Sequence, residues 1–222
     1  MDKVILCIAA AVVSYLVSGL NPSIILSKLI YHRDIRECGS GNPGFTNFKR
    51  TFGSRYAWFV FALDILKSLV LCIVFGFLFR AVFGSFALGA AYSCFFSMLG
   101  HCFPVWYGFE GGKGFLVCAA AVWFVDWRAA LIAFVIMNTL LFTVKYMSLS
   151  VIIAALSVVV SLIFFRPDHW AVLPLVILCV ALLIWRHREN IVRLMNGTER
   201  KFSLGSRRED EGAGDGPAPS GK

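Results

Sequence analysis

Charged side chains are scarce in this chain: Asp, Glu, Lys and Arg make up 15% of its 222 residues, against about 25% in a typical soluble domain. Hydrophobic residues make up 59%, against about 45–50% in soluble proteins. A soluble domain of this length could not hide so much apolar surface in one core. The composition therefore excludes an ordinary soluble enzyme and a disordered chain, and it predicts an all-α, polytopic integral membrane protein.

The chain also lacks the cysteine spacing of a metal site or a disulfide framework. Its seven cysteines are an odd number, and no two of them form a Cys-x-x-Cys pair. Most of them lie inside apolar runs, where cysteine is typical of a small buried hydrophobic residue. We therefore expect no metal ion. The cysteines are Cys7, Cys38, Cys72, Cys94, Cys102, Cys118 and Cys179.

Three familiar catalytic signatures are missing as well. The segment around Lys113 is not a Walker A loop, because the positions that need Gly before the Lys and Ser or Thr after it hold Tyr107 and Gly114. The sequence contains no Gly-x-Ser-x-Gly nucleophile elbow. It also lacks the Asp clusters that bind metal ions in diphosphate chemistry. These absences argue against a nucleotide-binding loop and a covalent serine, and we expect no cofactor.

Seven apolar runs are candidates for membrane-spanning helices, each of which needs about 20 residues. The first run resembles a signal peptide, but the six that follow favour an uncleaved span. The fourth run has only 11 residues and would reach about 17 Å as a helix. The distribution of charge must therefore decide whether it crosses. The runs are residues 4–20, 57–79, 82–99, 115–125, 129–144, 149–165 and 171–185.

The basic residues separate clearly if all seven runs cross. Of the 21 Lys and Arg residues, sixteen then lie on one side and four on the other, with Lys67 inside a span. If the fourth run did not cross, the basic segments after residue 185 would change sides and the asymmetry would be lost. Because cytoplasmic loops collect Lys and Arg, we expect the N-terminus outside and the C-terminus in the cytoplasm. The four external basic residues are Lys3, Arg80, Arg128 and Arg166.

The same distribution explains the net charge of +8 without a nucleic-acid partner. Residues 1–204 are expected to form one seven-helix membrane domain. Residues 205–222 are rich in charge, Gly, Pro and Ser, so we expect a disordered cytoplasmic tail.

The first expected cytoplasmic segment, residues 36–50, has the composition of a phosphate-binding loop. Its glycines let backbone N–H groups approach an anion closely, and Arg36 and Arg50 can bind phosphate through two hydrogen bonds each. The alternative is a flexible interfacial loop. The remaining candidates in this segment are Gly39, Ser40, Gly41, Asn42, Gly44, Thr46 and Asn47.

The second segment, residues 100–114, ends in glycines that precede the short fourth helix. A helix N-terminus preceded by glycines is an anion site, to which Lys113 would add a full charge. His101 is a general-base candidate or a histidine that orients the backbone at a helix end, and the sequence favours neither. The candidate glycines are Gly111, Gly112 and Gly114.

Two further segments and one charged pair complete the polar features. The turn at residues 145–150 contains Ser148, and His187 and Asn190 fall on one face of a helical extension after the last span. Within the second run, Asp64 and Lys67 are three residues apart and share a helix face. A buried pair that anchors helix packing is at least as good an interpretation as a catalytic one.

These segments, in this order, resemble the motifs of the bacterial acyl-phosphate:glycerol-3-phosphate acyltransferases, the PlsY family. Residues 39–50 are similar to G-S-G-N-x-G-A-T-N-x-x-R, and residues 100–114 are similar to G-H-x-F-P-V…F-K-G-G-K-G. Residues 186–199 match R-H-R-E-N-I-x-R-L-x-x-G-T-E throughout. Two positions depart from the family pattern: Phe45 replaces a usual Ala, and Glu110 replaces a usual Lys and puts a carboxylate beside the expected phosphate site.

The resemblance implies an acyltransferase of the bacterial inner membrane, in contact with membrane lipids. It would move a fatty acyl group from acyl phosphate to the 1-hydroxyl of sn-glycerol 3-phosphate, giving lysophosphatidic acid and inorganic phosphate in the first step of phospholipid synthesis. Two alternatives stay open: a membrane phosphate or anion transporter, and another lipid-head-group transferase. The residues expected to act in catalysis are Ser40, Arg50, Lys113, His187 and Asn190. Those expected to bind substrate phosphate are Arg36, Gly39, Gly41, Asn42, Gly44, Thr46, Asn47, His101, Gly111, Gly112, Gly114 and Ser148.

Overall fold

The computed structural model describes residues 2–166 and 170–202, and within these ranges it contains helices and no strand. The expected tail at 205–222 lies outside the described residues. The helices are α1 (Lys3–Gly19), α2 (Pro22–Tyr31), η1 (Ile35–Glu37), α3 (Phe45–Phe52), α4 (Ser54–Phe83), α5 (Phe86–Cys102), η2 (Val105–Tyr107), α6 (Phe115–Val125), α7 (Trp127–Thr143), α8 (Met147–Phe165), α9 (Val172–Arg186) and α10 (Arg188–Met195).

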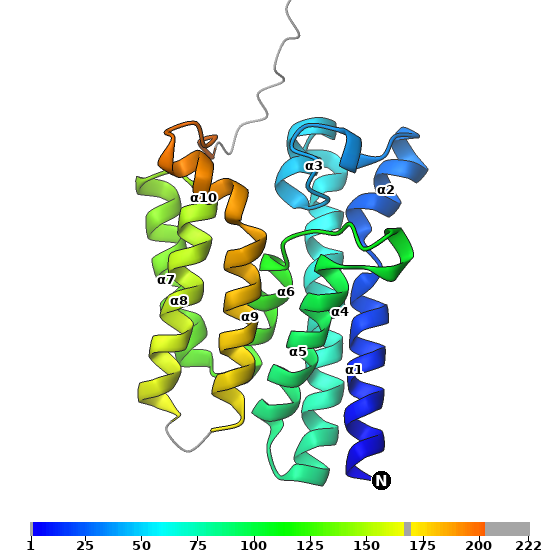
Figure 1. Ribbon diagram of the computed structural model, residues 1–222, viewed down its shortest axis with the longest axis vertical. Helices are drawn as coiled ribbons and strands as arrows, with labels where there is room; N and C mark the ends of the chain where they lie inside the picture. Colours follow the sequence, from blue (N-terminus) through cyan, green and yellow to red (C-terminus); the bar gives the residue numbers. More distant parts are fainter. Residues whose placement is uncertain (1, 167–169, 203–222) are drawn as a thin grey trace, which may run out of the picture.

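Helix α5 lies at the centre of the bundle and packs against α1, α4, α6 and α9, while α7 and α8 form a pair on the far side of α6 and α9 (Figure 1). Glycines allow the closest approaches. A Cβ on Gly100 would meet the Tyr15 carbonyl at 2.0 Å, and one on Gly89 would meet the Phe75 carbonyl at 2.2 Å. Small residues of this kind are typical of packed membrane helices.

The outer surface of the bundle is apolar. Phe164 is 76% exposed and Phe77 is 58% exposed, and many other large hydrophobic side chains are also exposed. Soluble monomers rarely expose so large an apolar area. Four helical stretches are long and apolar enough to cross a membrane, and α6, α7 and α9 are shorter apolar helices. Each of the seven apolar runs thus forms a helix, whereas seven crossings remain a prediction.

The region between the first two apolar runs is more ordered than its sequence indicates. It forms α2, η1 and α3, whereas the sequence indicated only a polar segment at residues 36–50 and no helix here. Asn21 begins α2 by accepting hydrogen bonds from the backbone N–H groups of Ser23 and Ile24, and Phe48 of α3 is fully buried. These short helices form a compact cap over one end of the bundle (Figure 1).

The opposite end is closed by a buried carboxylate. Asp126, between α6 and α7, forms ion pairs with Arg128 at 2.9 Å and Arg166 at 3.0 Å. Its side chain also accepts hydrogen bonds from the backbone of the first turn of α7. Arg128 and Arg166, two of the four basic residues expected on the outside, thus join α7 to the end of α8 through Asp126.

Candidate active site

The polar segments expected from sequence meet at the end of the bundle that carries α2, α3 and α10 (Figure 1). The loop between α5 and α6 crosses this end. Residues 36–47 lie on one side of that loop, and α10 with residues 196–202 lies on the other. Hydrogen bonds join each neighbour to the loop, so the site is built around residues 103–114.

Asn47 organises the first segment. Its side-chain oxygen accepts a hydrogen bond from the Ser40 N–H at 2.9 Å, and its amide group donates to the Cys38 carbonyl at 2.9 Å. Gly39 has φ +61°, and a Cβ there would meet Asn47 Oδ1 at 2.4 Å. Glycine is therefore required at this turn for both conformation and space. Asn47 is buried and shapes the loop, which leaves the Ser40 side chain exposed to solvent.

Arg36 joins the first segment to the second. Its guanidinium pairs with Asp34 at 2.8 Å and donates to the Tyr107 carbonyl at 2.9 Å. Because the hydrogen bond from Arg36 outweighs burial, it holds the pKa of Asp34 well below its usual range. The Arg36 guanidinium therefore has a structural role in addition to the phosphate-binding role expected for it.

The two departures from the family pattern have different environments. The Phe45 ring packs against Trp58 and Phe61 of α4, with ring centroids 5.2 and 5.4 Å away, so it fastens the start of α3 to the bundle. Glu110 is 77% exposed at its side chain and lies 3.5 Å from Arg36. A pair so exposed contributes little to stability.

The glycines of the second segment allow a close approach to His101. The Gly112 N–H donates to the His101 carbonyl at 3.0 Å. A Cβ on Gly112 would lie 2.2 Å from His101 Nε2, and one on Gly111 would lie 2.1 Å from the His101 carbonyl. Arg186, at the end of α9, donates to the carbonyls of Gly112 and Gly111 at 3.0 and 2.7 Å. Arg186, which was not among the residues expected at the site, thus fixes this loop from the opposite side.

His101 also contacts the charged pair inside α4. Lys67 Nζ lies 2.8 Å from Asp64 and 3.2 Å from His101 Nδ1. It also donates to the Ser18 and Leu20 carbonyls at the end of α1, at 2.8 and 3.1 Å. The geometry supports the anchoring interpretation of the pair, because Lys67 satisfies the open carbonyls of one helix from within another.

Lys113 and Asn190 meet across the site. The Lys113 ammonium donates a hydrogen bond to Asn190 Oδ1, which joins the glycine loop to α10. Burial, followed by the nearby charge of Arg193, lowers the pKa of Lys113 to about 8. A lysine with such a pKa is charged at neutral pH but only partly solvated, which favours binding of an anion.

Glu199 completes the network. Its carboxylate accepts hydrogen bonds from Asn190 Nδ2 at 2.7 Å, Ser148 Oγ at 2.8 Å and Arg193 Nε at 2.8 Å. Burial alone would raise the pKa of Glu199, but these hydrogen bonds together lower it, so the group stays ionised. Glu199 was not among the residues expected at the site, although it ends the C-terminal motif from which His187 and Asn190 were chosen.

His187 lies at the break between α9 and α10. Its ring is buried, and Nδ1 lies 2.8 Å from the Leu183 carbonyl. A carbonyl only accepts hydrogen bonds, so Nδ1 carries the proton and Nε2 is the acceptor. Burial lowers the pKa of His187 to about 4, with Lys113 contributing. The imidazole is therefore neutral at physiological pH, with a lone pair on Nε2.

Apart from His101, which contacts the charged pair of α4, the candidates with polar side chains fall into two groups. Lys113, Asn190 and Ser148 join one hydrogen-bonded network through Glu199, and His187 lies beside it. Ser40, Asn42, Thr46 and Arg50 belong to the first segment, on α3 and the turn before it, which reaches the rest of the site through Arg36.

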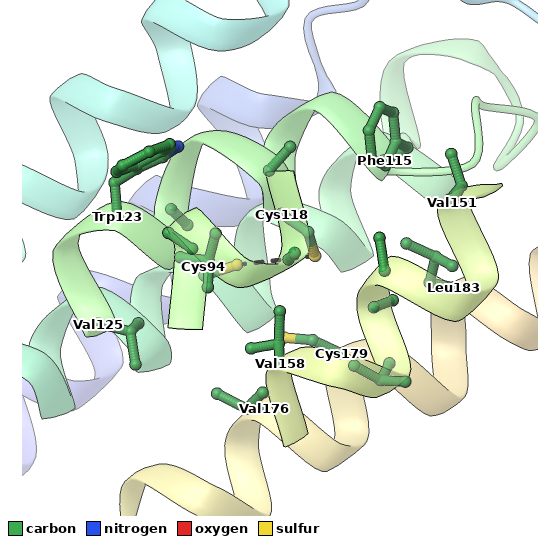
Figure 2. A pocket seen from close by; sticks show the side chains of 18 of the residues that line it. Cys94, Phe115, Cys118, Trp123, Val125, Val151, Val158, Val176, Cys179 and Leu183 are labelled. Atoms are coloured by element: carbon green, nitrogen blue, oxygen red, sulfur yellow. Dashed lines mark hydrogen bonds between the residues drawn. The ribbon is translucent and has the colours of Figure 1, made fainter. Parts of the chain in front are cut away.

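An apolar cavity of about 130 Å³ lies deeper in the bundle, among α5–α9 (Figure 2). Phe115 and Leu183 line this cavity. Phe115 follows Lys113 by only a few residues, and Leu183 precedes His187 by only a few. A cavity of this size holds a molecule such as benzene, so it is too small for a whole fatty acyl chain.

The family model described as glycerol-3-phosphate acyltransferase matches residues 8–197. The chain belongs to this family. It is 33% identical over 196 residues to the glycerol-3-phosphate acyltransferase of Finegoldia magna, covering 88% of this chain and 96% of that relative. Membership confirms the resemblance found in the motifs, and the chain is an acyltransferase of the membrane.

Two solved structures are similar along nearly the whole chain. One is PlsY (YgiH), an integral membrane glycerol 3-phosphate acyltransferase, in its glycerol 3-phosphate form, with a TM-score of 0.79 and 33% identity over 89% of this chain and 96% of that one. The other is its lysophosphatidic acid form, with a TM-score of 0.74 and 32% identity over 89% and 95% of the two chains.

Proposed function

We propose that this acyltransferase moves a fatty acyl group from acyl phosphate to the 1-hydroxyl of sn-glycerol 3-phosphate and releases lysophosphatidic acid and inorganic phosphate. The observation that carries the proposal is the network of Lys113, Asn190 and Glu199 beside a glycine-rich loop, at one end of an apolar bundle. The solved relatives are named for glycerol 3-phosphate and lysophosphatidic acid, which are the acceptor and the product of this reaction.

Two phosphate groups must be bound, because both substrates carry one. Lys113 supplies a charge at the N-terminus of α6, where Gly114 begins the helix without a side-chain cap. The N-terminus of α3 is likewise uncapped by a side chain and begins at Gly44, with Arg50 two turns further on. The two helix starts support two anion sites, with Gly39, Gly41, Thr46 and Ser40 as donors in the first.

The transfer needs no covalent enzyme intermediate, because phosphate is already a good leaving group. The glycerol 1-hydroxyl attacks the acyl carbonyl carbon, a new C–O bond forms, and the bond from the acyl carbon to the phosphate oxygen breaks. Before attack, the hydroxyl donates a hydrogen bond to His187 Nε2, which orients it. As the new C–O bond forms, this proton shifts to an oxygen of the departing phosphate. Lys113 stabilises negative charge as it moves onto the leaving phosphate.

The charge distribution supports a cytoplasmic site. Lys3, Arg80, Arg128 and Arg166 belong to helix ends at the end of the bundle opposite the site. Among the described residues, the remaining Lys and Arg outside α4 belong to the end that carries α3 and α10. By the preference of cytoplasmic loops for positive charge, this distribution supports seven crossings and an external N-terminus. The inner-membrane location is proposed from the family resemblance.

The deciding experiment supplies purified protein in lipid vesicles with a long-chain acyl phosphate and radiolabelled glycerol 3-phosphate. We expect labelled lysophosphatidic acid and one phosphate released per product. Acyl-CoA serves as the control donor and should give no product. Equal turnover with acyl-CoA, or the absence of product with acyl phosphate, would contradict the proposed donor.

A further inference from the structure

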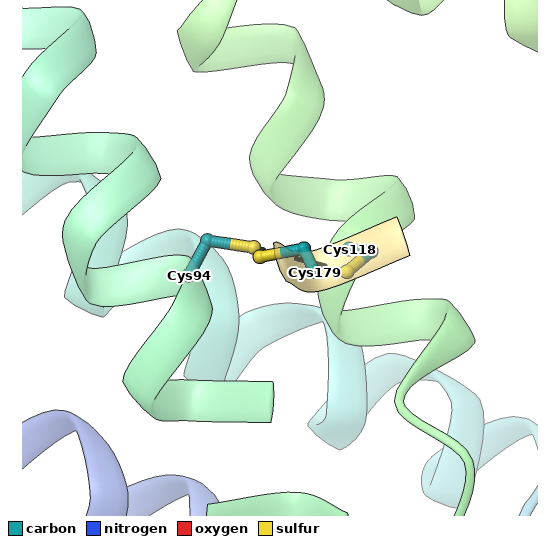
Figure 3. Close-up of side chains that lie close together, drawn as sticks. All are labelled: Cys94, Cys118 and Cys179. Atoms are coloured by element: carbon teal, nitrogen blue, oxygen red, sulfur yellow. Dashed lines mark hydrogen bonds between the residues drawn. The ribbon is translucent and has the colours of Figure 1, made fainter. Parts of the chain in front are cut away.

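Three cysteines from three helices meet in the interior of the bundle. Cys94 of α5, Cys118 of α6 and Cys179 of α9 place their sulfur atoms within 4.8 Å of one another (Figure 3). Cys94 and Cys179 are buried and Cys118 is partly buried, and all three line the apolar cavity (Figure 2). The acyl transfer described above uses none of these thiols.

A fourth sulfur atom lies against the cluster. The Cys118 thiol contacts Met98 Sδ, one helical turn along α5 from Cys94. Among the described residues that line the cavity, no carboxylate, histidine or basic side chain is present. The donors available to a ligand here are therefore all soft sulfur atoms, which prefer soft metal ions such as Cu(I) over the hard cations that oxygen binds.

The separation of the thiols fits a single ion at their centre. Three sulfur ligands at about 2.3 Å from a metal ion, in a trigonal arrangement, lie about 4.0 Å from one another. Cys94 Sγ and Cys118 Sγ are 3.9 Å apart. An ion could therefore be bound with small changes in side-chain rotamers and without movement of the helices.

The charge of the site selects the ion. A cavity without basic side chains disfavours excess negative charge. A monovalent ion needs one thiolate for neutrality: one S–H bond breaks, one metal–sulfur bond forms, the proton leaves to solvent, and no electron is transferred. The other sulfur atoms bind through their lone pairs. A zinc ion bound by three thiolates would instead leave a net negative charge in the membrane interior.

We propose that Cys94, Cys118 and Cys179, with Met98 as a fourth sulfur donor, form a binding site for a soft monovalent metal ion of the Cu(I) class. The bound ion joins α5, α6 and α9, the three helices that carry the second segment and lead into α10. Because the three thiols meet only in the folded protein, the ion binds the folded state in preference to the unfolded chain and so stabilises it.

The test titrates Cu(I), without oxygen, into purified, reduced protein in detergent in competition with a coloured Cu(I) chelator. We expect one Cu(I) per chain, a rise in the thermal unfolding temperature, and X-ray absorption showing only sulfur neighbours. Cys118→Ala should weaken binding at least tenfold, and Met98→Leu should weaken it less. The matched control is Cys72→Ala, a buried cysteine on α4 outside the cluster, which should bind like the original chain.

Two results would overturn the proposal. The first is equal Cu(I) binding by the Cys118→Ala variant and the original chain. The second is a nitrogen or oxygen neighbour of the ion in the original chain, which needs no variant and so does not depend on how the variants fold. Acyl transfer by each variant serves as the check of folding, because the thiols lie outside the network of Lys113.

Discussion

Lys113 donates a hydrogen bond to Asn190 across 77 positions of sequence, and this contact ties the loop before α6 to the helix that follows α9. Asn190 in turn donates to Glu199, so the position of the lysine depends on the C-terminal segment. Two residues expected from sequence to act in catalysis are thereby held in one geometry. The consequences of this arrangement can be tested residue by residue.

The first prediction concerns pH. Because burial lowers the pKa of Lys113 to about 8, its ammonium is charged below that pH and loses its proton above it. Binding of a phosphate group should therefore weaken as the pH rises through about 8, and kcat/KM for glycerol 3-phosphate should fall. The Lys113→Arg variant keeps its charge throughout, so its profile should stay flat over the same range. If the two proteins gave parallel profiles between pH 7 and about 9.5, the fall in kcat/KM at high pH would arise from the titration of another group.

The second prediction concerns Glu199. In Glu199→Gln one oxygen acceptor becomes an N–H donor that faces Asn190, Ser148 or Arg193, each of which donates to the carboxylate at 2.7–2.8 Å. We expect kcat to fall at least tenfold, equivalent to about 1.4 kcal/mol, with a smaller change in KM for acyl phosphate. Steady-state kinetics on the purified variant measure both.

The matched control is Glu37→Gln, an exposed carboxylate on η1, which should retain activity within about twofold. If Glu199→Gln behaved like this control, the carboxylate would have no role in positioning Asn190.

The third prediction concerns stability at the junction of the first two segments. Asp34→Asn removes the ion pair with Arg36, and we expect a loss of about 1.5–3 kcal/mol, seen as a lower thermal unfolding temperature in detergent. The folded pKa of Asp34 lies below its unfolded value of 3.8. Its stabilisation is therefore present above pH 3.8 and lost as the pH falls below it. Glu110→Ala, which breaks only an exposed pair, should change stability by less than about 0.5 kcal/mol; a larger loss than in Asp34→Asn would reverse the roles of the two carboxylates.

The helices could be predicted from sequence because their signal is local. The apolar run at residues 115–125 forms α6 with the same bounds. By contrast, α3 has no apolar run, and its position depends on contacts with distant residues, such as those between Phe45 and Trp58. Local patterns therefore predicted the bundle but not the helical cap over the site.

The residues of the site could be chosen from motifs, but their contacts could not. Phosphate binding by Arg36 stays a prediction, whereas its pairing with Asp34 and its hydrogen bond to the Tyr107 carbonyl depend on how the folded chain places these groups and could not be predicted. The cysteines gave no metal-site spacing, and Cys94, Cys118 and Cys179 meet only when α5, α6 and α9 have packed. Such clusters arise from tertiary structure and leave no spacing pattern in the chain.

The fourth prediction concerns orientation in the membrane. Trp127 is 62% exposed at the end of the bundle opposite the site, and Arg200 is exposed at the end that carries it. In intact cells, a membrane-impermeant maleimide should label Trp127→Cys, and it should label Arg200→Cys only after lysis. The original chain serves as the control for its native cysteines, which are buried or partly buried. Labelling of Arg200→Cys from outside would reverse the orientation.

The last prediction is that the acyl group passes directly between substrates. Ser148 Oγ already donates its proton to Glu199 at 2.8 Å, and Ser40 is exposed on a turn that Asn47 orders through the backbone. Among the described residues, no histidine is hydrogen-bonded to either hydroxyl in the way that activates a serine nucleophile. The acyl group of acyl phosphate is already activated, so attack by the glycerol hydroxyl suffices.

Incubation with labelled acyl phosphate, without glycerol 3-phosphate, should leave no covalent label on the denatured protein. Ser148→Ala should keep measurable transfer, because it loses one hydrogen bond to Glu199 while those from Asn190 and Arg193 remain. A stoichiometric label on Ser40, Ser148 or a cysteine that is released by added glycerol 3-phosphate would instead establish a two-step reaction. In that case Lys113 and His187 would have to stabilise two successive transition states, and water would have to be kept from the covalent intermediate between the two steps. The exposed turn at Ser40 would not protect an acyl group from water.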